Sequence, residues 1–137
     1  MRRLAVAAGA LLLFVGSARA AERAQLDNIK TEWQNAYGAI IYTVLATVKN
    51  VSDAPIVYAK IKVQLFDKDG KLVVEREGYN AGAEVLEVEG LPGSLEDKLK
   101  RVKPIAAGAT DLIRLSLDKT DIGKPFRTTK VELIEVR

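Results

Sequence analysis

The sequence predicts an all-β protein: an antiparallel β-sandwich of about six to eight short strands. Two observations indicate this. Apolar and polar residues alternate with a period of two through several segments after residue 39. Clusters of Gly, Pro, Asn and Asp separate these segments, as turns do. Because the chain has no cysteine, packing and sheet hydrogen bonds must stabilise it. Short strands divided by turns are typical of an immunoglobulin-like sandwich.

The alternation places the expected strands. In residues 40–48 the even positions are apolar, and in residues 57–65 the odd positions are apolar with lysines opposite. A slip of one residue would bury those lysines, so the second register is well specified. Further strands are expected at 72–74, 113–117 and 131–136, with Ile29–Trp33 a weaker first strand. In the last strand the apolar parity shifts to Ile134 and Val136, which indicates a bulge or an edge strand covered on both sides.

The segment Asp67–Gly70 has two interpretations, a metal loop or a hairpin turn. A calcium loop of the EF-hand kind needs about twelve residues with oxygen ligands at alternate positions. Here Gly70 directly follows Asp69, and the next residues resume a strand. Asp-Gly between two alternating runs is a strong hairpin signal, because glycine accepts positive φ at little cost. We therefore expect a turn, and we expect no metal or other cofactor.

The connection from Tyr79 to Gly108 breaks the strand pattern. Its first part is acidic and includes a possible short extra strand around Val85–Val88. After Pro92 and Gly93, Ser94 is expected to cap one short helix, with Asp97 three residues on. The apolar residues expected to bury one side of this segment are Leu91, Leu95, Leu99 and Val102. Pro104 is expected to end it.

The N-terminus reads as a secretory signal peptide. A charged start is followed by an apolar stretch and a small-x-small exit, so residues 1–20 are expected to be removed by cleavage between Ala20 and Ala21. An uncleaved anchor is the alternative, although the apolar stretch is shorter than the roughly 17 residues that a spanning helix needs. Residues 21–137 would then form a single domain without a transmembrane segment. The location expected is the bacterial periplasm or the extracellular medium.

Cleavage changes the charge. The whole chain has 21 basic and 18 acidic residues, but three arginines and no acidic residue lie in residues 1–20. The remaining domain has equal numbers of both signs, so no bulk positive charge favours nucleic acid or an anionic membrane. No interleaving of basic and aromatic residues indicates nucleic-acid binding either.

Three segments resemble the FxLYD domain family, small β-sandwiches of exported and membrane-attached bacterial proteins. Val63–Asp67 is similar to the family signature, Ala46–Asn50 to its strand end, and Ala107–Thr110 followed by Leu112 to its turn into a strand. The resemblance covers about residues 40–117. The departures are Val63 for Phe, Phe66 for Tyr, Ala46 for Gly and Ala107 for Pro, and the connection 79–108 is longer than usual. The resemblance implies a fold but no activity.

The inventory of reactive side chains is short. The chain has no histidine and no cysteine, and its one methionine is Met1. This excludes Ser-His-Asp and Cys-His nucleophile systems, histidine bases, and zinc and soft copper sites. A carboxylate pair or a Ser-Lys arrangement remains conceivable. Asp111, on the parity of Ile113 and Leu115, is the nearest candidate, yet a structural role at a strand edge is favoured. We therefore predict that the protein is not an enzyme.

A basic cluster in the connection is the candidate binding site. It consists of Lys98, Lys100, Arg101 and Lys103. A solvated helix face is the first interpretation. Internal pairing with Glu84, Glu87 and Glu89 is the second, and a docking patch for an acidic partner is the third.

The function predicted from these patterns is an exported, non-enzymatic protein-interaction or assembly module. It would act by strand addition at an exposed sheet edge or through the 79–108 connection, with another exported or envelope protein as its partner. The alternative is a carrier of a small molecule or glycan, with a cleft lined by residues such as Leu86, Leu91 and Phe126. A weak carboxylate-dependent hydrolase is a third hypothesis.

Overall fold

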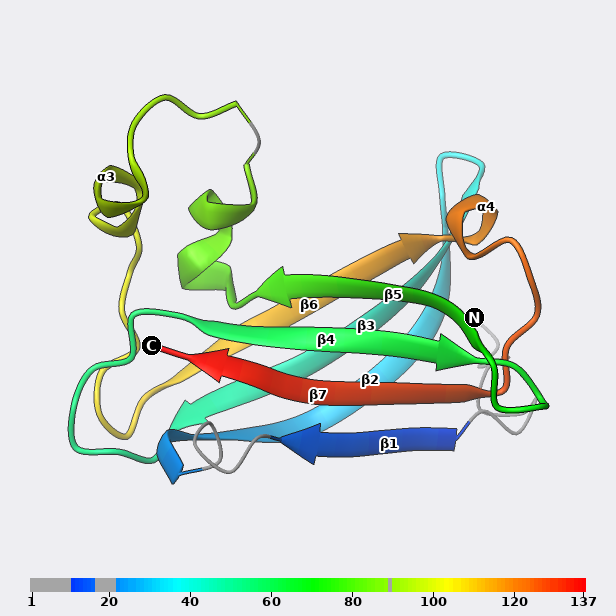
Figure 1. The fold of residues 1–137 in the computed structure, drawn as a ribbon, viewed down its shortest axis with the longest axis horizontal. Coiled ribbons are helices and arrows are strands. Elements are labelled where there is room, and N and C mark those ends of the chain that lie inside the picture. Colours follow the sequence, from blue (N-terminus) through cyan, green and yellow to red (C-terminus); the bar gives the residue numbers. More distant parts are fainter. Residues whose placement is uncertain (1–10, 17–21, 89) are drawn as a thin grey trace.

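A computed structural model describes residues 11–16, 22–88 and 90–137. In it two β-sheets pack face to face, and two short helical segments stand off one end of the sandwich (Figure 1). The elements in chain order are β1 (Leu11–Gly16), β2 (Ala24–Ala36), β3 (Ala39–Asn50), β4 (Ala59–Phe66), β5 (Leu72–Tyr79), the 3₁₀ helix η1 (Ala81–Glu87), α3 (Leu95–Leu99), β6 (Thr110–Asp118), α4 (Lys119–Ile122) and β7 (Thr128–Val136). The all-β prediction is confirmed.

The strand order is that of an immunoglobulin-like sandwich. One sheet has the order β2-β3-β6 and the other β1-β7-β4-β5. In an immunoglobulin domain strands A, B and E neighbour one another in one sheet, while F lies between C and G in the other. The strands β2, β3 and β6 take the places of A, B and E, and β4, β5 and β7 those of C, C′ and F. The place of G beside β7 is taken by β1.

The core lies between the sheets and follows the predicted alternation. On β4 the odd positions from Ala59 to Leu65 are fully buried, and on β3 the even positions from Tyr42 to Val48 are buried. Ile113, Leu115 and Leu117 of β6 and Val131 and Leu133 of β7 complete the layer. At the end near α4, Trp33, Tyr42 and Phe126 pack with ring centroids 4.9–5.9 Å apart. The inward residues are thus those selected by the period of two.

Two local irregularities explain where the pattern shifts. Lys60 pairs with Glu135 and Ile61 with Leu133, so Ile134 is an extra residue in β7. This bulge confirms the parity change expected in the last strand. A second irregularity in β2 separates Asp27 from Lys30, and Asn28 adopts a φ of 53° there. The strand β2 extends from Ala24 to Ala36, well beyond the segment Ile29–Trp33 that the sequence indicated.

The turn predicted at Asp67–Gly70 is confirmed. Asp67 Oδ1 accepts hydrogen bonds from the backbone N–H of Asp69 (2.8 Å) and of Lys71 (2.9 Å), and Gly70 has a φ of 79°. These bonds, the one from Lys71 foremost, hold the pKa of Asp67 below its ordinary value. The carboxylate therefore closes the corner between β4 and β5.

Asn50 stabilises the turn that follows β3. Its side chain is fully buried and donates to the carbonyl oxygens of Ala54 (2.8 Å) and Ile105 (2.9 Å). Its Oδ1 accepts from the backbone N–H and the hydroxyl of Ser52. The sequence Asn50-Val51-Ser52 fits a glycosylation signal, but the amide nitrogen is occupied and enclosed, so the residue serves as a turn.

The N-terminal segment that is described adds a strand to the sheet. Residues 11–16 pair in parallel with β7, from Leu11 opposite Thr128 to Gly16 opposite Leu133. The predicted cleavage residues Ala20 and Ala21 and the rest of the predicted signal peptide, residues 1–10 and 17–19, lie outside the described residues. Within the described ranges, no helix is long and apolar enough to cross a membrane.

Candidate interaction site

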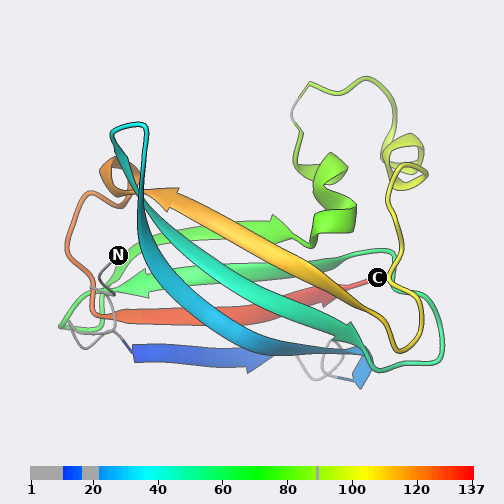
Figure 2. The same cartoon turned by 180° about the vertical axis from the view of Figure 1, so that it is seen from behind.

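The connection between β5 and β6 forms a compact lobe, which we define as residues 80–88 and 90–105. It stands off one end of the sandwich, at the upper left in Figure 1 and at the upper right in Figure 2, which is turned by 180°. The extra strand considered around Val85–Val88 is wrong, because residues 81–87 form η1. The helix expected after Ser94 is present as α3. Ser94 Oγ accepts from Asp97 N–H and Asp97 accepts from Ser94 N–H, which is the predicted capping box.

Asn80 and Asp111 attach the lobe to the sandwich. Asn80 is fully buried, and its Oδ1 accepts from the backbone N–H of Ala59 at 2.9 Å. Its Nδ2 donates to Asp111 Oδ2, which also accepts from Gly82 N–H, both at 2.8 Å. Asp111, the carboxylate nearest to a catalytic setting in the sequence, therefore holds η1 in place.

Close backbone contact joins the two halves of the lobe. Lys103 N–H donates to the carbonyl oxygen of Gly82 at 2.9 Å. A Cβ at position 82 would lie 2.6 Å from the Lys103 carbonyl oxygen, so only glycine fits without displacement. Ile105 and Ile56 then exchange backbone hydrogen bonds of 2.7 and 2.9 Å, which return the chain to the sandwich.

A small second core lies beneath the lobe. Tyr58, Ala83 and Val102 are buried together, and Tyr79, Val85, Leu86 and Leu99 pack against them. The rings of Tyr58 and Tyr79 meet edge to face with centroids 5.3 Å apart. Tyr58 is an even position of residues 57–65, on the side that carries the lysines, but its side chain is only 7% exposed because the lobe covers it. Of the apolar residues expected to be covered, Val102 is buried, but Leu95 is 58% exposed, because α3 is only five residues long.

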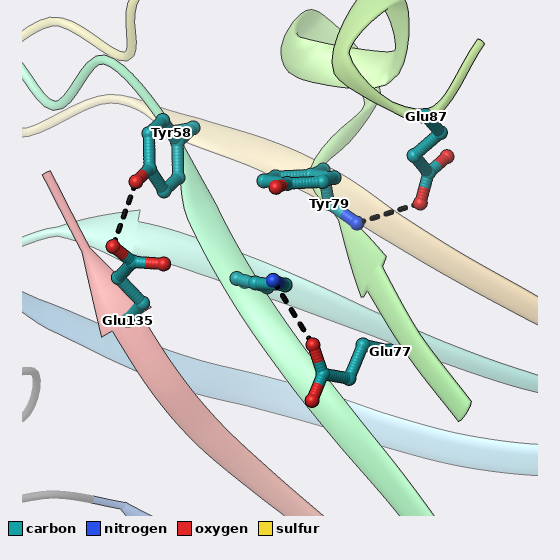
Figure 3. Close-up of polar contacts among 6 residues, drawn as sticks. Tyr58, Glu77, Tyr79, Glu87 and Glu135 are labelled. Carbon is teal, nitrogen blue, oxygen red and sulfur yellow. Dashed lines mark hydrogen bonds and ion pairs between the residues drawn. The ribbon is translucent and has the colours of Figure 1, made fainter. Parts of the chain in front are cut away.

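Polar contacts surround the two tyrosines (Figure 3). Tyr58 donates to Glu135 Oε2 at 2.8 Å, and the backbone N–H of Tyr79 donates to Glu87 Oε1 at 2.9 Å. Burial, followed by the bond to Glu135, raises the pKa of Tyr58. Glu135 and Glu87 thus link β7 and η1 to the same aromatic pair, which fixes the base of the lobe.

Lys60 completes the charged face beside these rings. Its Nζ lies 2.9 Å from Glu77 Oε1 and 5.3 Å from the centroid of the Tyr79 ring. The bond to Glu77 raises the pKa of Lys60 despite some desolvation. The lysine therefore stays protonated and spans β4 and β5 on the outer face of the sheet.

The candidate basic cluster lies in the second half of the lobe, from α3 to the point where the chain returns to the sandwich. Lys100, Arg101 and Lys103 are exposed and Lys98 is half-buried. Among the described residues the ion pairs are Lys60–Glu77, Arg76–Asp121 and Lys130–Glu132, so none joins the cluster to Glu84 or Glu87. Glu89 lies outside the described residues. Glu87 binds the Tyr79 backbone instead, so internal pairing of the two halves is not formed through Glu84 or Glu87.

An open groove of about 470 Å³ runs between the base of the lobe and the start of β6. Lys103 and Asp111 lie in its wall together with mainly small residues: Ala81, Gly82, Pro104, Ile105, Ala106, Ala109 and Thr110. The residues expected to line a carrier cleft do not meet there. Phe126 packs with Trp33 and Tyr42, whereas Leu86 packs into the second core.

These features define a class: a β-sandwich that carries a well-anchored lobe with a cluster of exposed basic residues. Residues 21–124 match the model of a protein family described as a protein of unknown function (DUF3426). The chain belongs to this family. The match begins after β1 and ends before β7. No curated protein matches the chain.

Proposed function

We propose that the protein is an exported, non-enzymatic interaction module that docks on a partner through its lobe. The proposal rests on two features of the lobe: its base is firmly anchored, and some of its basic residues are exposed. A buried hydrogen-bond network anchors its base, while Lys100, Arg101 and Lys103 are exposed on the lobe and form no ion pair with Glu84 or Glu87. Loops held on a rigid scaffold are where binding residues concentrate.

The chemistry of this surface favours an acidic partner. Exposed cations steer the approach of an oppositely charged protein and fix its orientation. Leu95, at 58% exposed, and Val88, at 50%, supply apolar contact area on the same lobe. The partner proposed is another exported or envelope protein, in keeping with the signal peptide expected at residues 1–20.

Charge reversal tests the docking surface. The variant Lys100→Glu/Arg101→Glu/Lys103→Glu, used as bait in a pull-down from periplasmic extract, is expected to lose the partner that the parent chain captures. The matched control reverses three other exposed lysines, Lys68 and Lys71 between β4 and β5 and Lys124 after α4. The β4–β5 turn and α4 lie at the end of the sandwich away from the lobe (Figure 1). The control is expected to keep that partner. Equal capture by both variants would contradict docking through the lobe.

A carrier of a small molecule or glycan is the second candidate, and the groove favours it. Lys103 and Asp111 would supply polar contacts and the small residues would supply room. Ala106→Trp is expected to fill the groove and to abolish the thermal stabilisation given by any compound that binds there. A compound that stabilises both forms equally would exclude the groove as its site.

We also propose kinship with the FxLYD domains that three segments resemble. Two residues of those segments support it, because each closes a corner: Asn50 by its buried amide and Asp67 by its carboxylate. This kinship concerns the fold and adds no activity.

A further inference from the structure

The outer edge of β7 is covered by a segment from the other end of the chain. Six residues, Leu11–Gly16, pair with Thr128–Leu133 in parallel. The same side of the sheet in an immunoglobulin domain holds strand G. A strand that follows F through a hairpin must run antiparallel to it. The occupant here is parallel, so it is supplied from a distant part of the sequence.

The core side chains that the structure describes lie on elements other than β1. Among the side chains that the structure describes, the main core cluster runs from Ala24 to Leu133. The sheet β2-β3-β6 and the strands β7, β4 and β5 are paired without β1. A chain that begins at residue 22 therefore retains the full set of core residues described.

Loss of the covering strand would leave β7 as an edge. The predicted cleavage after Ala20 removes residues 11–16, and the backbone N–H and C=O groups of β7 that point away from β4 then lose their partners. An edge of this kind is a template for another strand. Thr129, Val131 and Leu133 are buried at the inner face, so β7 is fixed in position by the core and stays extended.

We propose that the outer edge of β7 is a strand-acceptor site. In the uncut chain Leu11–Gly16 fills it, and after cleavage an extended apolar segment of a partner protein, running parallel to β7, takes the same place. The kind of occupant follows from the segment that fills this edge in the uncut chain. That segment, Leu-Leu-Leu-Phe-Val-Gly, is apolar and pairs in parallel with β7. Main-chain hydrogen bonds provide the affinity of such a complex and alternate side chains provide its specificity. The inference rests on the proposed function for export with cleavage after Ala20 and for the existence of a partner, and it uses a surface outside the lobe.

The first test examines the uncut chain, produced in the cytosol so that residues 1–20 are retained. Leu13 and Lys130 are register partners. Adjacent strands lie about 4.8 Å apart, within the Cα separation of a disulfide. Because the natural chain has no cysteine, Leu13→Cys/Lys130→Cys is expected to form one intramolecular disulfide on mild oxidation. The matched control is Leu13→Cys/Gln64→Cys. Gln64 is the β4 partner of Lys130 and lies two strand spacings from Leu13, about 9.6 Å, which is too far.

The second test measures strand addition to residues 22–137. The probe is a fluorescent peptide of residues 11–16 with two lysines at each end for solubility. Its anisotropy is expected to rise with the shortened chain, and to require at least tenfold more protein with the uncut chain. A peptide carrying Leu12→Pro/Leu13→Pro lacks two successive N–H groups, one of which must face β7 because N–H groups alternate in direction along a strand, and it is expected not to bind. A shortened chain bearing the Lys100, Arg101 and Lys103 reversals is expected to bind the probe normally, which separates this site from the proposed docking lobe.

Three outcomes would overturn the inference. The first is equal cross-linking in the two double-cysteine variants. The second is a shortened chain that is folded by circular dichroism yet does not bind the probe, or binds the proline peptide as well. The third is a shortened chain that sediments as a dimer with β7 protected by a second copy. Loss of the natural partner on lobe reversal would leave this inference standing, and failure of the probe would leave the lobe proposal standing.

Discussion

At the scale of the residue, a few polar side chains fix the corners where the alternating pattern stops. Asn50, Asp67 and Asn80 each satisfy backbone groups that a turn leaves without partners. The sequence indicates the first two as turn residues, because Ser52 and Pro55 follow Asn50 and Gly70 follows Asp67 within a few residues. It does not indicate Asn80, whose partners Ala59 and Asp111 are 21 and 31 residues away.

Tyr37 is held in an unfavourable conformation at the tip of the β2–β3 hairpin. Tyr37 and Gly38 have φ values of 51° and 84°, which a type I′ turn requires, and the tyrosine is fully exposed. Asparagine accepts this conformation more readily than tyrosine, so Tyr37→Asn is expected to stabilise the protein by about 1 kcal/mol. Urea unfolding measures the gain, and Tyr37→Phe serves as the control without effect. A less stable Asn variant would show that the tyrosine makes a stabilising contact.

Asn80→Ala is expected to destabilise the protein by about 2–4 kcal/mol, because it leaves the buried N–H of Ala59 without an acceptor and breaks the bond to Asp111. Chemical unfolding monitored by tryptophan fluorescence measures this. Asn35→Ala, at an exposed position of β2, should change the free energy of unfolding by less than about 0.5 kcal/mol. Similar effects of the two substitutions would refute the anchoring role of Asn80.

The free energy of unfolding is expected to depend on pH through Asp67. Its pKa is lowered in the folded protein, chiefly by the Lys71 N–H, so it stabilises the fold above the ordinary value of about 3.9 and this contribution is lost as the pH falls through the folded pKa. Carboxyl NMR titration is expected to give Asp67 a midpoint below about 3.9. Asp67→Asn should reduce the loss of stability between neutral and acid pH. A midpoint at or above the ordinary value would contradict the hydrogen bonding at this corner.

At the scale of the element, the strands were predictable and the lobe was only partly so. In a half-buried strand, apolar residues that face the core alternate with polar residues that face solvent. The strands at residues 40–48 and 57–65 could therefore be placed with their register. The capping box of α3 is also local, so Ser94 and Asp97 revealed it. The 3₁₀ helix η1 depends on Asp111 and on the contact of Gly82 with Lys103. These partners are distant in sequence, so no local sequence pattern predicts η1.

Gly82→Ala tests whether that contact holds the lobe. The added methyl group would meet the Lys103 carbonyl oxygen at 2.6 Å, and strain of about 1–3 kcal/mol is expected. Amide hydrogen exchange of residues 83–103 should then speed up roughly tenfold or more, while β3 amides keep their rates. Glu84→Ala, an exposed substitution in the same helix, is the control and should leave the lobe unchanged. Unaltered exchange in Gly82→Ala would show that the two halves of the lobe are not coupled there.

At the scale of the whole molecule, the sequence predicted the two-layer architecture but not the role of the apolar N-terminal segment. Leu11–Gly16 is apolar throughout and carries no alternation, so it satisfies the pattern of a signal peptide and also that of a strand at a sheet edge. The proposed interaction surfaces could likewise be predicted only in part from the sequence. The sequence displays the charges of the lobe, but strand addition uses backbone groups that every residue possesses.

The account therefore depends most on β7 being an edge that another strand covers. Amide hydrogen exchange resolved by residue, on the uncut chain and on residues 22–137 at the same pH, measures this directly. We expect the alternate amides of Thr128–Leu133 that point away from β4 to be protected in the uncut chain and to exchange rapidly in the shortened one, while those that point toward β4 stay protected in both. Identical protection of β7 in the two chains would contradict it.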